Sequence, residues 1–522
     1  MQKKHLNNEV IYQIYPLTFG YASGSKTDPY PSGAYGNLKG ITARVKYVKS
    51  LGVDAIWITP FYKWGGHGFG YDMTDYCSVD EMYGDLDDFK ELCETYHRYG
   101  IRVLIDQVYN HCSIYHPWFK ESEEKKLGFE DFFIWADAKG YDEEGKPIPP
   151  NNWQSIWDSS GDCAWTWSDT RKQFYMHSFD YTMPNLNLNN RRVQDEILKV
   201  ARFWFDLGVD GFRLDAVTHY ACDPKLRDNP LDKKGNQIRR YDINTIGGAE
   251  FINRLKELGN TYEKPKTLLA EYWYDKSPKG FEKAKKIITE SRCDAFFTGA
   301  LNRGLRGLMD SLKDEMLISP NGEKLNWVFS NHDLERAPSR IFGNKQTLAR
   351  KKLLMELLMT LPGSICIFQG EELGLPNPKA MAECKNPDND PLNVWTNFNS
   401  PWDAARAGFA MSDSPDDPSR KLALHPSEEQ YKYAVSRQKW DSDSMLNHTK
   451  NWIHFRKGSR FFSGYGNIIP IKVKKANVIA FVRTNEDNTS RCLCVFNFNE
   501  YPVEVRYKGK KRICYGESCI LD

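Results

Sequence analysis

The stretch Gly208-Val209-Asp210-Gly211-Phe212-Arg213-Leu214-Asp215-Ala216 reads as the end of a helix followed by a buried strand. Gly208 suits the left-handed position that ends a helix, and the apolar residues after it suit a strand inside a sheet. Alternate residues of a strand face the same side, so Arg213 and Asp215 should project together at its carboxyl end. The guanidinium would keep the acid ionised, as a nucleophile requires, although a structural ion pair explains the two residues equally well when they are taken alone.

The same unit, a helix ending in glycine followed by a short apolar strand, recurs along the chain. It stands around Gly52 and Gly100 as well as around Gly208, and residues 86–96 and 193–204 place apolar side chains on one helix face. About eight such units favour a TIM barrel, (β/α)8, over an open doubly wound sheet, and the dinucleotide fingerprint is absent after the first strand. The expected strands lie at residues 10–15, 55–58, 103–106, 211–215, 267–270, 295–297, 325–329 and 364–368.

Two segments interrupt this alternation. Residues 112–179 are rich in loops, proline and tryptophan, and residues 461–522 alternate apolar and polar side chains in the manner of strands. We therefore expect an α/β fold in which the barrel comprises residues 1–111 and 180–460. An insertion domain at 112–179 would follow the third strand, and an all-β domain would occupy 461–522. The active site of such a barrel forms at the carboxyl ends of its strands.

Composition bears on the partners and the compartment. The net charge is only +2, which predicts an uncharged ligand and neither nucleic acid nor a membrane surface as a partner. Residues 1–10 lack the apolar region of a secretory signal, and no apolar run approaches transmembrane length. The 12 cysteines are scattered, which predicts reduced thiols and a cytoplasmic location. The oligomeric state is left open.

Carboxylates and histidines follow several of the expected strands. Two carboxylates that flank a bond, one ionised and one protonated, form the machinery of a retaining glycosidase. Asp215 suits the ionised role beside Arg213. Glu271 has apolar neighbours that should favour the protonated form, and Asp333 could stabilise positive charge at the anomeric carbon. The residues at the strand ends are Asp106, Asn110, His111, Arg213, Asp215, Glu271, Asn331, His332 and Asp333.

In order and spacing, these segments resemble the conserved regions of the alpha-amylase family of glycoside hydrolases. The resemblance extends from about residue 10 to the end of the chain. Within the family, residues 110–119, 150–153 and 330–336 look like the alpha-glucosidase and oligo-1,6-glucosidase branch. The matching segments are Asp106–His111, Gly211–Ala216, Ala270–Glu271, Phe329–Asp333, Gly52–Pro60, Gly70–Tyr76 and Met183–Asn187.

The resemblance implies a role for each of the three acids. Asp215 would be the nucleophile, Glu271 the general acid/base and Asp333 the transition-state stabiliser. No cofactor is implied as a requirement. The terminal glucose would be bound by Tyr71, Asp72, His111, Arg213 and His332.

The chain also departs from the pattern of this branch. A calcium loop rich in aspartate commonly follows the first strand, whereas residues 20–37 contain only one acid, Asp28, so that loop is not recognisable. Asn110 and His219 match positions that contribute to another calcium site in true amylases, which leaves the metal assignment open. An arginine frequent in the branch is not visible at residues 397–403, and its loss weakens the inference of strictly exo action.

The leading hypothesis is a retaining, exo-acting alpha-glucosidase that releases terminal α-1,4-linked glucose from short malto-oligosaccharides. The small Ala216 favours α-1,4 bonds, because oligo-1,6-glucosidases tend to carry valine there. One alternative is an oligo-1,6-glucosidase, and another is an α-glucosyltransferase or isomerase acting on sucrose, maltose or trehalose. From a different class, the chain could be a non-catalytic carbohydrate-binding or transporter-associated relative, which the complete set of three acids disfavours.

Overall fold

The fold is built on a closed barrel of eight strands, seen in a computed structural model. In hydrogen-bonded order the strands are β1-β15-β14-β13-β12-β11-β5-β2. β1 pairs in parallel with both β2 and β15. β11 pairs in parallel with β12, and β14 with β15. The TIM-barrel prediction is confirmed. The structure describes residues 6, 8–22, 34–68, 70–156, 163–273, 278–298, 304–379, 403–462, 464–507, 510–514 and 518–521.

The barrel strands match the expected runs to within one or two residues. Most of their residues are buried, because helices cover a parallel barrel on the outside while side chains fill its interior. The strands are β1 Val10–Ile14, β2 Ala55–Ile58, β5 Arg102–Gln107, β11 Gly211–Leu214, β12 Thr267–Glu271, β13 Ala295–Thr298, β14 Leu325–Val328 and β15 Ser364–Phe368.

Glycine ends the helices that the recurring unit predicted. Gly52, Gly100 and Gly208 have φ values of 84°, 68° and 105°, in the left-handed region that glycine adopts without strain. The helix before Gly100 begins with a capping box, in which Asp85 and Asp88 each accept a hydrogen bond from the other's backbone. These local signals set the helix ends and return the chain to the sheet.

Further helices and short 3-10 turns complete the described chain. The α-helices are α1 Pro16–Phe19, α2 Leu38–Ala43, α3 Val45–Leu51, α4 Leu86–Arg98, α5 Pro117–Glu123, α6 Arg191–Asp206, α7 Ile246–Gly259, α8 Pro278–Glu290, α9 Gly304–Ile318, α10 Ala337–Phe342, α11 Leu348–Thr360, α12 Glu428–Tyr431, α13 Val435–Gln438 and α14 Met445–Gly458. The 3-10 turns are η1 Val217–His219, η2 Gly343–Lys345, η3 Glu371–Leu373, η7 Asp403–Arg406 and η8 Pro418–Lys421.

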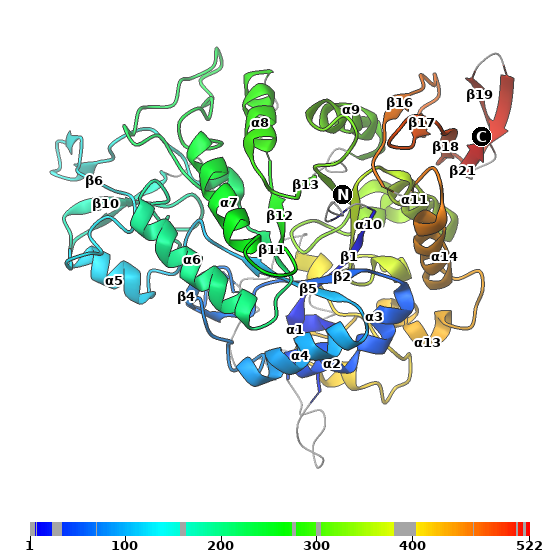
Figure 1. The fold of residues 1–522 in the computed structure, drawn as a ribbon, viewed down its shortest axis with the longest axis horizontal. Helices are drawn as coiled ribbons and strands as arrows, with labels where there is room; N and C mark the ends of the chain where they lie inside the picture. The colour runs from blue at the N-terminus through cyan, green and yellow to red at the C-terminus, as the bar shows by residue number, and fades with distance from the viewer. Residues whose placement is uncertain are drawn as a thin grey trace. The chain divides into compact units, whose positions relative to one another are not determined.

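The chain divides into two compact units. The first unit comprises residues 1–59, 82–104 and 297–522, and the second comprises residues 60–81 and 105–296. Within the second unit, α7 packs against both α6 and α8, and the three helices run side by side in green in Figure 1. Within the first unit, α14 packs against α11.

Residues 112–179 contain small sheets and a compact aromatic core. β10 (Gln173–Met176) pairs with β6 (Trp135–Ala136) and β9 (Trp165–Ser168), and β7 (Gly140–Tyr141) pairs with β8 (Pro147–Ile148). Trp153 and Trp165 are buried, with ring centroids 5.9 Å apart. Packing therefore accounts for these two tryptophans. Two short strands, β3 (Lys63–Trp64) and β4 (Met73–Asp75), pair outside this segment.

Residues 461–522 are rich in strands, as the alternation predicted. β16 (Ile468–Pro470), β17 (Val478–Thr484), β18 (Arg491–Asn497) and β21 (Ser518–Leu521) form a four-stranded sheet. β19 (Val503–Tyr507) pairs with β20 (Lys510–Cys514). The division of the chain into a barrel, an insertion domain and a terminal domain at the expected boundaries stays a prediction.

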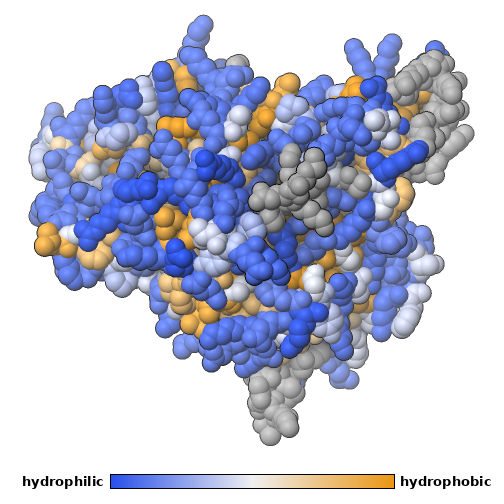
Figure 2. Space-filling view, viewed as in Figure 1, coloured by the Kyte–Doolittle hydropathy of each residue, from blue (hydrophilic) through white to orange (hydrophobic). Residues whose placement is uncertain are grey.

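The surface is polar on the face shown in Figure 2, where hydrophilic residues predominate and apolar residues are scattered. No helix in the described part of the chain combines the length and the apolar composition needed to cross a bilayer.

Candidate active site

Three carboxylates from three barrel strands surround one arginine in the second unit. Arg213 on β11 is fully buried, and its Nη1 donates to both oxygens of Asp106, at 2.9 and 3.1 Å, and to Asp215 Oδ1 at 2.7 Å. Its Nη2 lies 3.0 Å from Glu271 Oε2 in an ion pair whose angle does not suit a hydrogen bond. The three anions outweigh burial and raise the pKa of Arg213 well above its usual value, so the guanidinium stays charged.

Glu271, the last residue of β12, has more polar surroundings than the sequence suggested. Its Oε2 accepts a hydrogen bond from the backbone N–H of Ala216 at 3.0 Å, in addition to the Arg213 contact. Both contacts stabilise a carboxylate rather than a protonated acid. Ala216 itself adopts the left-handed region, with φ 47° and ψ 38°, directly after Asp215. The structure thus joins β11 and β12 through the backbone of the residue that follows the candidate nucleophile.

Asp72 and Tyr71 lie in the loop before β4, also in the second unit. Tyr71 Oη donates to Asp106 Oδ2 at 3.2 Å, which connects this loop to the cluster around Arg213. Asp72 is buried and accepts hydrogen bonds from the backbone N–H groups of His67 at 3.0 Å and Gly68 at 2.8 Å. Burial raises the pKa of Asp72 to about 6 in spite of these hydrogen bonds. The carboxylate is therefore held in place but is costly to ionise.

His111 is a neutral imidazole with one unused nitrogen. Asn110 Nδ2 donates to its Nδ1 at 3.1 Å, which leaves the proton of the neutral ring on Nε2. That Nε2 is buried and makes no well-formed hydrogen bond in the described chain. Burial lowers the pKa of His111 to about 3, against a smaller opposing effect of the Tyr71 backbone. A buried N–H without a partner is suited to a ligand hydroxyl.

His332 and Asp333 belong to the first unit, where they follow β14. Gln13 Nε2 lies 2.7 Å from His332 Nδ1, and His332 Nε2 lies 3.1 Å from Asp333 Oδ2. The other oxygen of Asp333 accepts a hydrogen bond from Arg406 Nη2 at 3.0 Å. Neither Gln13 nor Arg406 is predicted as a site residue from the sequence. A polar residue inside the apolar run Val10–Ile14 was a usable signal for Gln13, whereas nothing in the pattern around Arg406 indicated a role.

Two of the departures from the family pattern fall partly on residues that the structure does not describe. These are residues 23–33 of the expected calcium loop and residues 397–402 of the segment without the arginine. In the parts that it does describe, no three His, Cys, Asp or Glu side chains form a cluster able to hold a metal ion. His219 is buried between the rings of Phe179 and Trp273, and neither of its ring nitrogens has a hydrogen-bond partner among the described residues.

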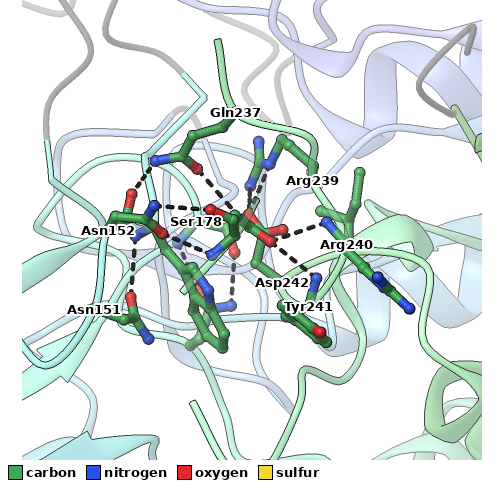
Figure 3. A network of polar contacts seen from close by, with 12 residues as sticks. Asn151, Asn152, Ser178, Gln237, Arg239, Arg240, Tyr241 and Asp242 are labelled. Carbon is green, nitrogen blue, oxygen red and sulfur yellow. Dashed lines mark hydrogen bonds and ion pairs between the residues drawn. The ribbon is translucent and has the colours of Figure 1, made fainter. Parts of the chain in front are cut away.

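Amide side chains hold the loop that follows the candidate nucleophile. Asn152 and Asn229 exchange two hydrogen bonds, from Asn229 N to Asn152 Oδ1 at 2.8 Å and from Asn152 Nδ2 to Asn229 O at 2.9 Å. Asn229 Oδ1 accepts from the backbone N–H groups of Arg240 and Tyr241, and Gln237 donates to the Asn152 carbonyl (Figure 3). Residues 229–241 are thereby fixed to the segment around Asn152 within the second unit.

The chain matches the model of a known protein family over most of its length. Residues 13–464 match the family model for the alpha-amylase catalytic domain. The chain belongs to the alpha-amylase family of glycoside hydrolases. The match covers the seven barrel strands from β2 to β15 and the last two residues of β1, and it includes the candidate site residues of both units.

Individual members of the alpha-amylase family extend the comparison. A probable alpha-glucosidase of Rhizobium meliloti is 35% identical over 94% of this chain and 89% of its own length. An oligo-1,6-glucosidase of Saccharomyces cerevisiae is 34% identical over 72% of this chain and 65% of its own length. Among solved structures, that of an alpha-glucosyl transfer enzyme superimposes with a TM-score of 0.85 at 30% identity and covers both chains completely.

Proposed function

We propose that this chain is a retaining, exo-acting alpha-glucosidase that hydrolyses terminal α-1,4-linked glucose in short malto-oligosaccharides. The observation that carries the proposal is the cluster in which Arg213 contacts Asp215, Glu271 and Asp106. Two carboxylates held beside one cation supply an ionised nucleophile and a second acid for proton transfer, as retaining glycoside hydrolysis requires. The relatives named as alpha-glucosidases support the substrate class.

Asp215 is the proposed nucleophile and Glu271 the proposed acid/base. In the first step an Asp215 oxygen bonds to the anomeric carbon, the glycosidic C–O bond breaks, and Glu271 gives its proton to the departing oxygen. In the second step water attacks the same carbon, Glu271 takes a proton from that water, and Asp215 is released as a carboxylate. Because Glu271 rests among contacts that favour its ionised form, its proton must be taken up when substrate binding changes these surroundings.

The remaining expected residues are proposed to hold the glucose and the developing charge. Asp333 stabilises positive charge at the anomeric carbon, in line with its carboxylate chemistry. The N–H at His111 Nε2 donates to a sugar hydroxyl, and Asp72 accepts from one. Tyr71, Arg213 and His332 complete the proposed glucose-binding set.

We also propose a cytoplasmic location and a small, uncharged oligosaccharide as the substrate, with neither nucleic acid nor a membrane as a partner. Buried thiols support the location, since Cys112 and Cys222 are not in disulfides. The sulfur atoms of Cys492 and Cys494 are 3.8 Å apart, well beyond the S–S bond length of about 2.05 Å. The nearly balanced charge supports the neutral ligand.

Glucosyl transfer is the second candidate, and the full-length likeness to an alpha-glucosyl transfer enzyme favours it. The covalent intermediate is the same in both reactions, and a sugar hydroxyl takes the place of water as the acceptor. Product analysis with maltose at high and low concentration separates the two, since transfer yields oligosaccharides longer than maltose.

The proposed function is tested with Asp215→Ala on an aryl α-glucoside. We expect turnover to be abolished, and an α-configured glucose to appear first when the wild-type reaction is followed by NMR. Asp223→Ala is the matched control, because Asp223 also pairs with an arginine, Arg227, but lies outside the cluster. Substantial turnover by Asp215→Ala, or β-glucose as the first product, would refute the proposal. Maltose, isomaltose, sucrose, trehalose and starch as substrates then define the linkage and chain length.

A further inference from the structure

Arg406 makes two directed contacts with consecutive residues after β14, all within the first unit. It is the last residue of η7, and its Nε donates to the carbonyl oxygen of His332 at 2.7 Å. Its Nη2 donates to Asp333 Oδ1 at 3.0 Å. The guanidinium carbon also lies 5.7 Å from the centre of the Tyr15 ring. One planar group thereby connects the backbone of His332 to the side chain of Asp333.

The His332 ring fixes the other oxygen of Asp333. Tyr15 stacks on the ring with centroids 6.3 Å apart, and Trp57 meets it edge-on at 6.0 Å. The Gln13 amide donates to Nδ1 at 2.7 Å, so the proton of the neutral ring is on Nε2, which lies 3.1 Å from Asp333 Oδ2. Each carboxylate oxygen of Asp333 therefore faces a different nitrogen donor.

Burial distinguishes this arrangement from an ordinary surface ion pair. The Asp333 side chain is 44% exposed, whereas that of Arg406 is only 13% exposed. An exposed carboxylate is free to rotate toward water unless a rigid partner holds it, and surface pairs with flexible partners contribute little. The fork of an arginine loses less freedom than a lysine when it forms two hydrogen bonds, and its own burial restricts it further.

We propose that Arg406 is a positioning residue that holds Asp333 in one orientation and in its ionised form. The inference rests on the proposed function, in which Asp333 stabilises the charge that develops at the anomeric carbon. Arg406 acts through Asp333 and touches no reacting atom itself. Its contribution belongs to the chemical step, so it affects kcat more than KM.

The test compares Arg406→Ala and Arg406→Lys with the wild type on an aryl α-glucoside and on maltose. We expect Arg406→Ala to lower kcat by about 10- to 100-fold, with little change in KM, because a small misplacement of a charged group has an effect of that size. Arg406→Lys keeps the charge but not the planar, two-pronged donor group, so its kcat should lie between those of the wild type and Arg406→Ala. Guanidinium ions should restore part of the activity of Arg406→Ala. In the pH profile of kcat, which reports the enzyme–substrate complex, the acid limb should also move to higher pH, since Asp333 has lost a neighbouring cation.

Arg420→Ala is the matched control. Arg420 lies in the same unit, pairs with Glu428 and packs on the ring of Tyr431, without contacting the His332–Asp333 pair. Arg420→Ala should leave kcat, KM and the pH profile of the enzyme unchanged. If Arg406→Ala does not fold, as judged by thermal unfolding, Arg406→Lys decides, and wild-type kcat in that variant overturns the inference.

A double-mutant cycle separates this inference from the proposed function. Activity retained by Asp333→Asn alone contradicts the role proposed for Asp333 and with it the proposed function. If Asp333→Asn is impaired, Arg406→Ala in that background should cause little further loss, because the two changes act on one group. An undiminished further loss, or wild-type kcat in Arg406→Ala alone, overturns the inference for Arg406 and leaves the proposed function standing.

Discussion

Replacing Arg213 by methionine tests whether one cation holds the carboxylate cluster together. Arg213 and Asp106 are both fully buried, and Nη1 of the arginine contacts both oxygens of the aspartate. Methionine fills a similar space with a flexible, uncharged side chain. Asp106 would retain the hydroxyl of Tyr71, 3.2 Å away, as a hydrogen-bond donor but would lose its counter-charge.

The expected loss of stability follows from this burial. Removing one partner of a buried ion pair lowers the free energy of unfolding by about 3–5 kcal/mol, because the other charge is left without compensation. The stranded carboxyl group can escape the penalty by binding a proton. For each pH unit below the raised pKa of Asp106 in the variant, the loss in the free energy of unfolding becomes smaller by about 1.4 kcal/mol. The loss at pH 7.5 should therefore exceed the loss at pH 5.5 by up to about 2.7 kcal/mol.

Urea unfolding followed by tryptophan fluorescence, at both pH values, measures these differences against the wild type. Arg213→Met with Asp106→Asn should regain part of the stability, since the unpaired charge is removed. Arg437→Met is the control, because Arg437 pairs with Asp413 at the surface and its side chain is 56% exposed. Arg437→Met should lower the free energy of unfolding by less than about 1 kcal/mol. A loss in Arg213→Met no larger than in this control, or an equal loss at both pH values, would show that Arg213 does not compensate a buried charge on Asp106.

Three further predictions each concern one residue. Burial raises the pKa of Glu371 from 4.5 to about 7, so the folded state keeps this proton to higher pH than the unfolded state does. The free energy of unfolding of the wild type should therefore fall by about 3 kcal/mol relative to that of Glu371→Gln as the pH rises from about 4 to 8, as measured by urea unfolding. Burial raises the pKa of Asp72 to about 6, so kcat/KM on maltose should fall as the pH drops through about 6, and Asp72→Asn should lower kcat/KM at every pH and remove that step. Ala216→Val should raise the ratio of isomaltose to maltose hydrolysis while lowering the free energy of unfolding by about 1–3 kcal/mol, because a β-branched residue is strained at φ 47°; an unchanged ratio in substrate assays would contradict the linkage argument.

The barrel could be predicted from the sequence because its signals are local. Each strand is a short apolar run, and glycine marks the helix ends at Gly52, Gly100 and Gly208. The pairing of Arg213 with Asp215 also followed, because alternation along one strand puts both side chains on the same face. Such signals require no knowledge of how distant segments meet.

Other parts of the site could not be predicted, because they depend on contacts between segments far apart in the chain. Apolar neighbours in sequence suggested a protonated Glu271, whereas its carboxylate faces Arg213 and the backbone of Ala216 from the adjacent strand. The left-handed conformation of Ala216 carries no sequence signal, since alanine rarely adopts it. Arg406 is a single arginine in a segment without periodicity, and only its contacts with His332 and Asp333 reveal it.

The charge balance around Arg213 has a consequence for selectivity between states of the substrate. One guanidinium faces three carboxylates, so this part of the site holds an excess of negative charge before any sugar arrives. A neutral glucoside gains little from that excess. The sugar ring becomes positively charged only while its glycosidic bond is breaking. The excess of negative charge repels the carboxylates from one another in the resting site. The same excess would bind the positively charged, reacting sugar more tightly than the neutral, intact glucoside.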